Sequence, residues 1–233
     1  MLMRKYASIP ASDIESYKAV MCFEMAGKDL TLKMDSGATL SLKFDAFPSK
    51  KLFAGGSETG IPYDCAKISD QVIFITYQLQ EALIAYVLDM EKGLATRIFT
   101  GADNKSLINF GTAGDAPDAQ AFTDDMGGNK VRWLLGKEDA SAFLADYTAD
   151  GLNITRPFAE GAPAIAASDF KAVKITKEVY LQNFTAQTEG ETLNVNLVSN
   201  FESITCVGSI YSISATQGAK LKLFAGYGRF IKE

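Results

Sequence analysis

The 233-residue chain contains no histidine and a single tryptophan. Without imidazole, the sequence excludes Ser-His-Asp and Cys-His nucleophile systems, histidine proton shuttles, and zinc or iron sites with histidine ligands. Cys22, Cys65 and Cys206 are odd in number and show no C-x-x-C spacing, so we expect no transition-metal site and no cofactor. Because each cysteine lies in an apolar segment, all three are predicted to be small buried core residues.

Long apolar runs and blocks of positive charge are also missing. No apolar run approaches the roughly 18 residues of a membrane-spanning helix, and Met1–Tyr6 leads into polar sequence rather than the apolar core of a signal peptide. The net charge is −5 and the densest basic cluster is only Lys50-Lys51, so no Lys/Arg stripe is present to neutralise a nucleic-acid backbone. We therefore expect a cytoplasmic protein without a nucleic-acid or membrane partner.

The sequence does contain a faint internal repeat. Four segments of the first half recur in the same order in the second half, at offsets that rise from 101 to 110 residues: Gly27–Leu30 with Gly128–Val131, Leu52–Gly56 with Pro157–Gly161, Ala66–Val72 with Val173–Val179, and Glu81–Leu83 with Glu191–Leu193. Slowly rising offsets are typical of small loop insertions in a duplicated domain, whereas chance matches would scatter in both directions. The chain is predicted to use one β-domain twice.

Short apolar or alternating segments, separated by turn residues, predict the strands of this β-domain. Eight strands are expected in each half, from Val20–Met25 to Leu94–Thr100 in the first and from Val131–Leu135 to Leu221–Phe230 in the second. Short strands joined by hairpin turns are typical of antiparallel barrels. The expected fold class is therefore all-β, with two tandem antiparallel barrels.

Composition predicts the boundaries of the two barrels. The capping-box sequence Ser12–Glu15 predicts a short N-terminal helix before the strands begin. Residues 102–127 are rich in Asp, Ala, Gly and Pro and poor in β-branched residues, which predicts a linker or covering loop. The helix and first barrel are therefore expected within residues 1–101, and the second barrel within residues 128–233.

The strand faces differ between the two halves. In Thr192–Val198, Leu and Val alternate with Thr and Asn, which predicts that one face is wet or lines a polar cavity. Val72–Tyr77 and Ala82–Leu88 are instead apolar on both faces. Two explanations stay open: the outer face packs against the other barrel or a second subunit, or the inner face bounds a ligand cavity.

Several of these hydrophobic-pattern segments carry a family resemblance: Ile61–Asp64, Val72–Tyr77 and Val87–Thr96 in the first half, and more loosely Glu178–Leu181 and Gly208–Tyr211 in the second. In these segments the chain resembles the MoaF-like proteins, a family named for molybdenum cofactor biosynthesis protein F and placed with lipocalins among the calycins. The resemblance implies tandem lipocalin-like (calycin) barrels with an interior that can hold a small, largely apolar molecule.

Arg97 is the most informative candidate for ligand chemistry, since it shares a strand face with Ala95 and Phe99. If that face points inward, the guanidinium can bind a substrate carboxylate or stabilise an enolate. If it points outward, the long side chain simply reaches water. Tyr77 and Tyr86 would add phenol donors to the same cavity, or serve as core aromatics with satisfied hydroxyls.

Other candidates lie elsewhere along the chain. Tyr63 and Asp64 would combine a hydroxyl donor with a carboxylate base near the start of a strand, or form a surface pair. In the second half, four aromatic or cationic residues are best placed to line a cavity: Trp133, Arg156, Tyr180 and Tyr211. Each of them has a structural role in the core as its alternative.

Three functional hypotheses follow. The first is a cytosolic protein that binds a small apolar or aromatic molecule in a barrel. The second is a cofactor-independent isomerase, cyclase or lyase without histidine or metal, in which Tyr and Arg polarise a carbonyl while a carboxylate moves a proton. The third is a structural protein with filled barrels, in which the apolar outer face of the first copy is a homodimer contact.

Overall fold

A computed structural model describes residues 22–114, 119–135, 142–148, 151–155, 167–188, 191–214 and 218–231. Every regular element within these ranges is a β strand, so the predicted all-β class is confirmed. The predicted N-terminal helix and the candidate Arg156 lie outside the described residues. Over the same ranges, no helix has the length and apolarity needed to cross a membrane.

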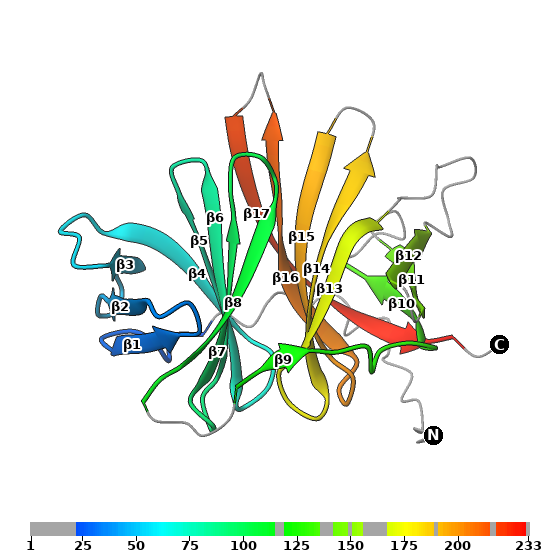
Figure 1. Ribbon diagram of the computed structural model, residues 1–233, viewed down its shortest axis with the longest axis horizontal. Helices are drawn as coiled ribbons and strands as arrows, with labels where there is room; N and C mark the ends of the chain where they lie inside the picture. Colours follow the sequence, from blue (N-terminus) through cyan, green and yellow to red (C-terminus); the bar gives the residue numbers. More distant parts are fainter. Residues whose placement is uncertain are drawn as a thin grey trace.

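The first half of the chain forms a closed antiparallel barrel (Figure 1). Its strands are β1 (Asp29–Met34), β2 (Thr39–Phe44), β3 (Lys51–Ala54), β4 (Ile61–Lys67), β5 (Val72–Leu79), β6 (Ala82–Asp89), β7 (Leu94–Thr100) and β8 (Ser106–Thr112). Each strand pairs with the next, and β8 returns to β1, where Met34 lies opposite Gly111. Alternate residues point inward and form one core, in which Leu32, Leu52 and Ile75 are fully buried.

Two sequence predictions for this half are wrong. A linker was expected over 102–127, but β8 lies within it, pairs with β7 and closes the barrel. A strand was expected at Val20–Met25, but the described part of that segment forms turns. Met25 inserts into the barrel core and is only 1% exposed, so Cys22–Lys28 closes one barrel end and is called the plug segment below.

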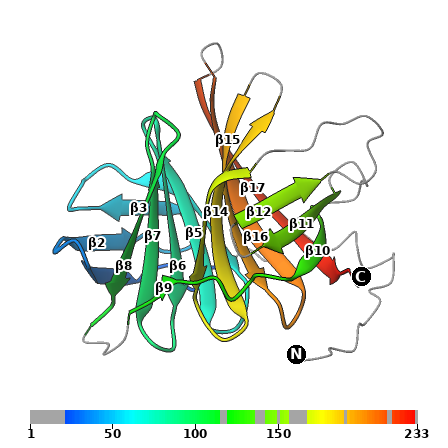
Figure 2. The same ribbon diagram turned by 45° about the vertical axis from the view of Figure 1, so that its right-hand side comes forward.

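The second half forms a nine-stranded antiparallel sheet that curls into a half-barrel beside the first barrel (Figures 1 and 2). Its strands are β9 (Ala121–Phe122), β10 (Lys130–Leu134), β11 (Ala142–Thr148), β12 (Gly151–Thr155), β13 (Ala167–Lys174), β14 (Val179–Thr188), β15 (Glu191–Asn200), β16 (Thr205–Ser214) and β17 (Gly218–Phe230). Their order is β12-β11-β10-β17-β16-β15-β14-β13-β9, so no ladder joins β12 to β13 within the described residues. The eight strands predicted for this half correspond to β10–β17.

The two halves share the same hydrogen-bonded turns. The side-chain oxygens of Ser69 and Thr176, which are 107 residues apart, each accept the backbone N–H groups two and three positions later. In the same way, Oδ1 of Asp89 and Oδ1 of Asn200 each accept two N–H groups of the following turn. The offset between these two residues is 111, which continues the rising offsets of the sequence repeat.

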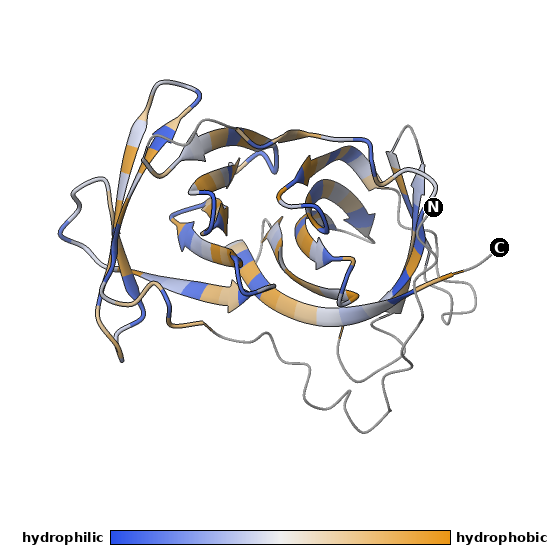
Figure 3. Cartoon of the chain, turned by 90° about the horizontal axis from the view of Figure 1, so that it is seen from below, coloured by the Kyte–Doolittle hydropathy of each residue, from blue (hydrophilic) through white to orange (hydrophobic). Residues whose placement is uncertain are grey.

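A shared apolar core joins the outer faces of the two barrels. Val72 and Phe74 of β5 lie in it, and so do their counterparts Val179 and Leu181 of β14, so the halves pack through equivalent faces. Figure 3 shows the barrels side by side, with hydrophobic and hydrophilic residues alternating along the strands. The predicted packing of the apolar outer face against the other barrel is confirmed, and this face is not available for a homodimer contact.

Polar side chains border the contact between the barrels. Asn194 and Asn196, on the polar face of β15, are 1% and 0% exposed, so this face is neither wet nor the wall of a polar cavity, contrary to the prediction. Asn194 Nδ2 donates to Ser106 Oγ at 2.8 Å. Tyr211 OH, on the neighbouring strand, donates to the carbonyl oxygen of Glu81 at 2.6 Å. These bonds satisfy buried polar groups where the two halves meet.

A disulfide between Cys22 and Cys65 corrects the prediction of three unlinked core cysteines. It ties the plug segment to β4 across a sequence separation of 43 residues. Cys206 is free and 3% exposed, as predicted for a small core residue, and burial raises the pKa of its thiol. The pairing escaped prediction because the two partners belong to different elements and no spacing pattern connects them.

Candidate functional site

Arg97 lies in the middle of β7 and faces the interior of the first barrel. Strand alternation places it on the same face as Ala95 and Phe99, both of which belong to or pack against the barrel core. In the strand register it lies between Tyr86 of β6 and Asn109 of β8. Its guanidinium carbon is 5.5 Å from the centre of the Phe99 ring. Of the two orientations left open by the sequence, the structure has the inward one.

Tyr77 and Tyr86 lie beside Arg97 in the same interior. Their rings are stacked, with centroids 6.4 Å apart and planes 23° apart, and both residues are 2% exposed. Burial raises the pKa of the Tyr77 hydroxyl far above its usual value, the neighbouring Tyr86 phenol raises it further, and the Arg97 cation opposes this shift. The structure therefore brings three of the candidate residues together, and it keeps Tyr77 protonated as a hydrogen-bond donor.

Arg97 is unpaired. Its buried Nε donor has no acceptor, and the side chain makes no hydrogen bond or ion pair within the part of the chain that the structure describes. Strand alternation places no Asp or Glu of β1–β8 on an inward position, since Asp64 and Asp89 fall on outward ones. A buried donor without an acceptor costs roughly 1–3 kcal/mol. A carboxylate or carbonyl oxygen of a bound molecule would remove that cost.

The interior of the second half contains a polar network that satisfies itself. Trp133 Nε1 donates to Tyr147 OH at 3.3 Å, and Tyr147 OH donates to Gln182 Oε1 at 2.7 Å. The chain continues from Gln182 Nε2 to Ser199 Oγ, also at 2.7 Å. Burial raises the pKa of the Tyr147 hydroxyl, which therefore stays protonated as the donor. Trp133 thus has a structural role in this network, and its indole N–H is not available to a ligand.

The remaining candidates do not join the Arg97 cluster. Tyr63 points inward and packs edge-to-face on Phe44, with centroids 5.1 Å apart. Asp64, the next residue on the strand, faces the opposite side, so the two cannot act as a donor and base on one ligand. Tyr180 is 8% exposed and packs in the core of the second half. Tyr211 lies on the outer face, in the contact between the barrels.

The end of the first barrel opposite the plug segment is lined by apolar side chains. Leu40, Ala54, Ile61 and Phe99 lie at the strand ends there, and each is only partly buried against the core. Phe99 is two residues from Arg97 on the same face. Arg97 is therefore close to this end of the barrel.

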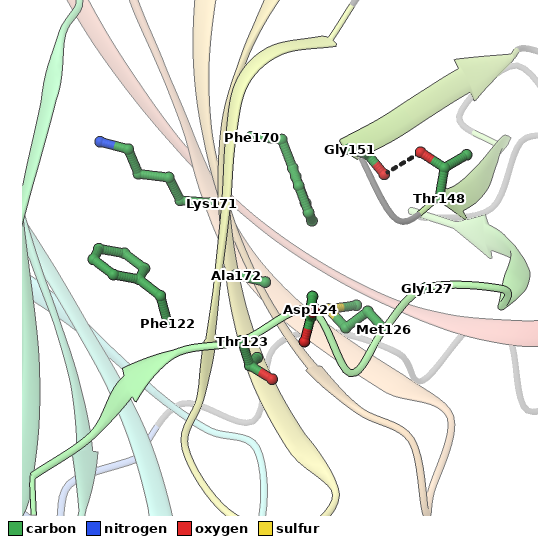
Figure 4. A pocket seen from close by; sticks show the side chains of 10 residues that line it. All are labelled: Phe122, Thr123, Asp124, Met126, Gly127, Thr148, Gly151, Phe170, Lys171 and Ala172. Atoms are coloured by element: carbon green, nitrogen blue, oxygen red, sulfur yellow. Dashed lines mark hydrogen bonds between the residues drawn. The ribbon is translucent and has the colours of Figure 1, made fainter.

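A cleft of about 230 Å³ opens in the second half, between β12 and β13 (Figure 4). Phe170 of β13 faces Thr148 and Gly151, and Asp124 and Met126 lie along the base. None of these residues was predicted from the sequence. Phe170 could have been identified as the counterpart of Tyr63, 107 residues earlier, but strand alternation alone does not reveal an unpaired seam.

The chemistry available to Arg97, Tyr77 and Tyr86 is the binding and polarisation of an oxygen atom by one cation and two phenols. No cluster of three or more Cys, Asp or Glu side chains able to hold a metal ion occurs in the described residues. Compared with known proteins, the sequence matches no protein-family model and no curated relative.

Proposed function

We propose that the first barrel binds a small, largely apolar or aromatic molecule that carries a carboxylate or carbonyl oxygen. The oxygen pairs with Arg97, and the apolar body lies against Tyr77, Tyr86 and Phe99. The observation that carries this proposal is the unpaired Arg97 guanidinium on the inner face of a closed barrel. A protein that uses arginine only for structure normally gives its buried donors a partner.

Binding is favoured over catalysis by the same set of residues. An isomerase or lyase of the kind considered above needs a carboxylate to move a proton, and Asp64 lies on the outer face. The chain is proposed to be a MoaF-like tandem lipocalin-like protein, because the segments that resemble this family form most of β4–β7. Filled barrels with a purely structural role are the third possibility, and they predict no ligand.

The test is calorimetric titration of the purified protein with two pairs of probes. The first pair is 1-naphthoate and 1-naphthylmethanol, and the second is laurate and dodecanol. Arg97→Met should weaken binding of the two anions by about ten- to a hundredfold, since hydrogen bonds to charged groups contribute roughly 1.5–3 kcal/mol. Binding of the alcohols should change little. Arg229→Met, on an exposed position of β17, is the matched control.

Native mass spectrometry of the protein purified from cells gives an independent measurement. A retained adduct that is lost in Arg97→Met supports the proposal and reports the ligand mass. A clean apo mass, together with no heat of binding for any of the four probes, contradicts it and favours filled barrels.

The compartment is a separate question. The sequence predicts the cytoplasm, whereas the Cys22–Cys65 disulfide favours an oxidising compartment, because cytosolic thiols are usually kept reduced. Trapping free thiols with an alkylating reagent in intact cells decides between the two. Protection of both cysteines before reduction places the protein in an oxidising environment.

A further inference from the structure

The cleft between β12 and β13 lies where the strand pairing of the two halves differs. In the first barrel, β3 pairs with β4 at this seam, with Leu52 opposite Ile61. The Cys22–Cys65 disulfide ties the plug segment to β4, one of the two strands of this seam. In the second half no ladder joins the counterpart strands within the described residues, and the cleft of about 230 Å³ opens there instead.

The second half keeps the backbone geometry of the disulfide position without the disulfide. Thr123 N donates to Ala172 O at 3.0 Å, as Cys22 N donates to Cys65 O at 3.0 Å. Thr123 and Ala172 are thus the counterparts of the two cysteines. Both line the cleft. The cleft is therefore found in the half that lacks both the disulfide and the pairing between the third and fourth strands.

The lining of the cleft combines an apolar base with one free negative charge. Met126 and Ala172 are 2% and 4% exposed, and the Phe170 ring stands beside them. Asp124 makes no ion pair among the described residues, whereas the adjacent Asp125 is paired with Lys174. Lys171 also lines the cleft, and Figure 4 shows its side chain on the other side of β13 from Phe170.

We propose that this cleft is a second ligand site, separate from Arg97, which takes a small aromatic amine. The aromatic ring packs against Phe170 and the Met126 thioether, contacts that aromatic rings and sulfur make favourably. The ammonium group pairs with the Asp124 carboxylate and lies near the Thr123 hydroxyl. The volume equals roughly eight water molecules of liquid, which fits one ring with a short side arm.

The charge of this site is opposite to that of the first barrel. Arg97 favours an anion or a carbonyl oxygen, and Asp124 favours a cation. The two sites therefore distinguish ligands of similar apolar size by the sign of the charge at one end.

The experiment restores the missing disulfide. In Thr123→Cys/Ala172→Cys, oxidation should form a disulfide, because the backbone of these positions matches that of Cys22 and Cys65, and its sulfur atoms, on two positions that line the cleft, should narrow it. Binding of phenethylammonium, followed by ligand-observed NMR, should fall at least tenfold on oxidation and recover on reduction. The wild-type protein, measured with and without the same reductant, controls for reduction of the native disulfide.

Two further measurements separate this site from the first one. Asp124→Asn should weaken phenethylammonium binding about two- to fivefold, the range expected for one exposed ion pair, and Arg97→Met should leave it unchanged. The anionic isostere 3-phenylpropionate should not compete with phenethylammonium. The proposal is overturned if phenethylammonium does not bind saturably, if oxidation of the double variant leaves its binding unchanged, or if 3-phenylpropionate displaces it. None of these outcomes depends on whether Arg97 binds a ligand.

Discussion

Replacing Arg97 with methionine should stabilise the protein in the absence of ligand. Methionine keeps most of the unbranched stem of arginine, so the packing inside the barrel is largely preserved. The substitution removes the buried Nε donor that has no acceptor, a group that costs roughly 1–3 kcal/mol. It also removes the contact between the guanidinium and the Phe99 ring, which contributes about 0.5–1 kcal/mol. The balance is a gain of about 1 kcal/mol in the free energy of unfolding.

The assay is urea denaturation followed by far-ultraviolet circular dichroism, supported by thermal unfolding. A gain of this size corresponds to a rise in melting temperature of roughly 2–4 °C for a domain of this size. Arg229→Met, at an exposed position, should stay within about 0.5 kcal/mol of the wild type. A ligand that pairs with Arg97 should reverse the order, since at a hundred times its wild-type Kd it stabilises the wild type by about 2.7 kcal/mol and the variant, which binds ten- to a hundredfold more weakly, by only about 0.4–1.4 kcal/mol.

A loss of stability in Arg97→Met would refute this reasoning. It would mean that the guanidinium is held by interactions that contribute to folding, and that its position in the barrel is structural. In that case the proposed ligand site in the first barrel would lose its main support.

Three further predictions concern stability, each measured by urea denaturation. Asp89→Asn should stabilise the protein by about 1 kcal/mol, because Asp89 is 1% exposed, an amide costs less to bury than a carboxylate, and Asn200 performs the same capping role in the second half. Gly226→Ala should destabilise it by about 1–3 kcal/mol, because a Cβ there would lie 2.4 Å from a backbone oxygen of the neighbouring strand. Cys22→Ala/Cys65→Ala should lower the free energy of unfolding by up to about 4 kcal/mol, the value expected for opening a loop of this length.

Each of these predictions has a contradicting outcome. A destabilised Asp89→Asn would show that the negative charge is favourable where it lies. A neutral Gly226→Ala would show that the strands can separate to admit a methyl group. Gly218→Ala, at the first residue of β17 with φ of 69° and nothing within 4 Å of an added Cβ, tests only the backbone cost. An unchanged stability of the double cysteine variant would show that the link does not constrain the unfolded chain.

Strand positions in the second half could be predicted because alternation and turn residues mark them clearly, as in β15. In the first half β8 was missed, because Ser106–Thr112 is a short strand inside a Gly- and Asp-rich stretch. The repeat was found, but one match was out of register. The position of β12 makes Leu152 the counterpart of Leu52, not Pro157, since both leucines are buried core residues of the third strand of their half.

The orientation of Arg97 could not be settled from sequence for a physical reason. The alternation of side chains shows which residues share a face of the strand. It shows which face points outward only when that face meets water and is therefore polar. In β7 both faces contact an apolar core, since Ile98 packs in the core between the barrels while Ala95 packs in the barrel interior. The inner face can be identified only once the position of the second half is known, and the contact with that half depends on residues more than 100 positions away.

Equivalent positions in the two halves of the chain have different roles: in one half the residue is structural, and in the other it is proposed to face a ligand. The counterpart of Arg97 is Gly208, whose missing side chain leaves room for Phe224, with an added Cβ lying 2.5 Å from that ring. Conversely, the network of Tyr147 and Gln182 has no counterpart in the first barrel, where Phe44 and Ile75 occupy those positions. The proposed Arg97 site faces the interior of the first barrel, the cleft opens at a seam of the second half, and the contact between the barrels is formed by outer faces. A change at either site can therefore alter ligand preference without disturbing the surface that holds the two halves together.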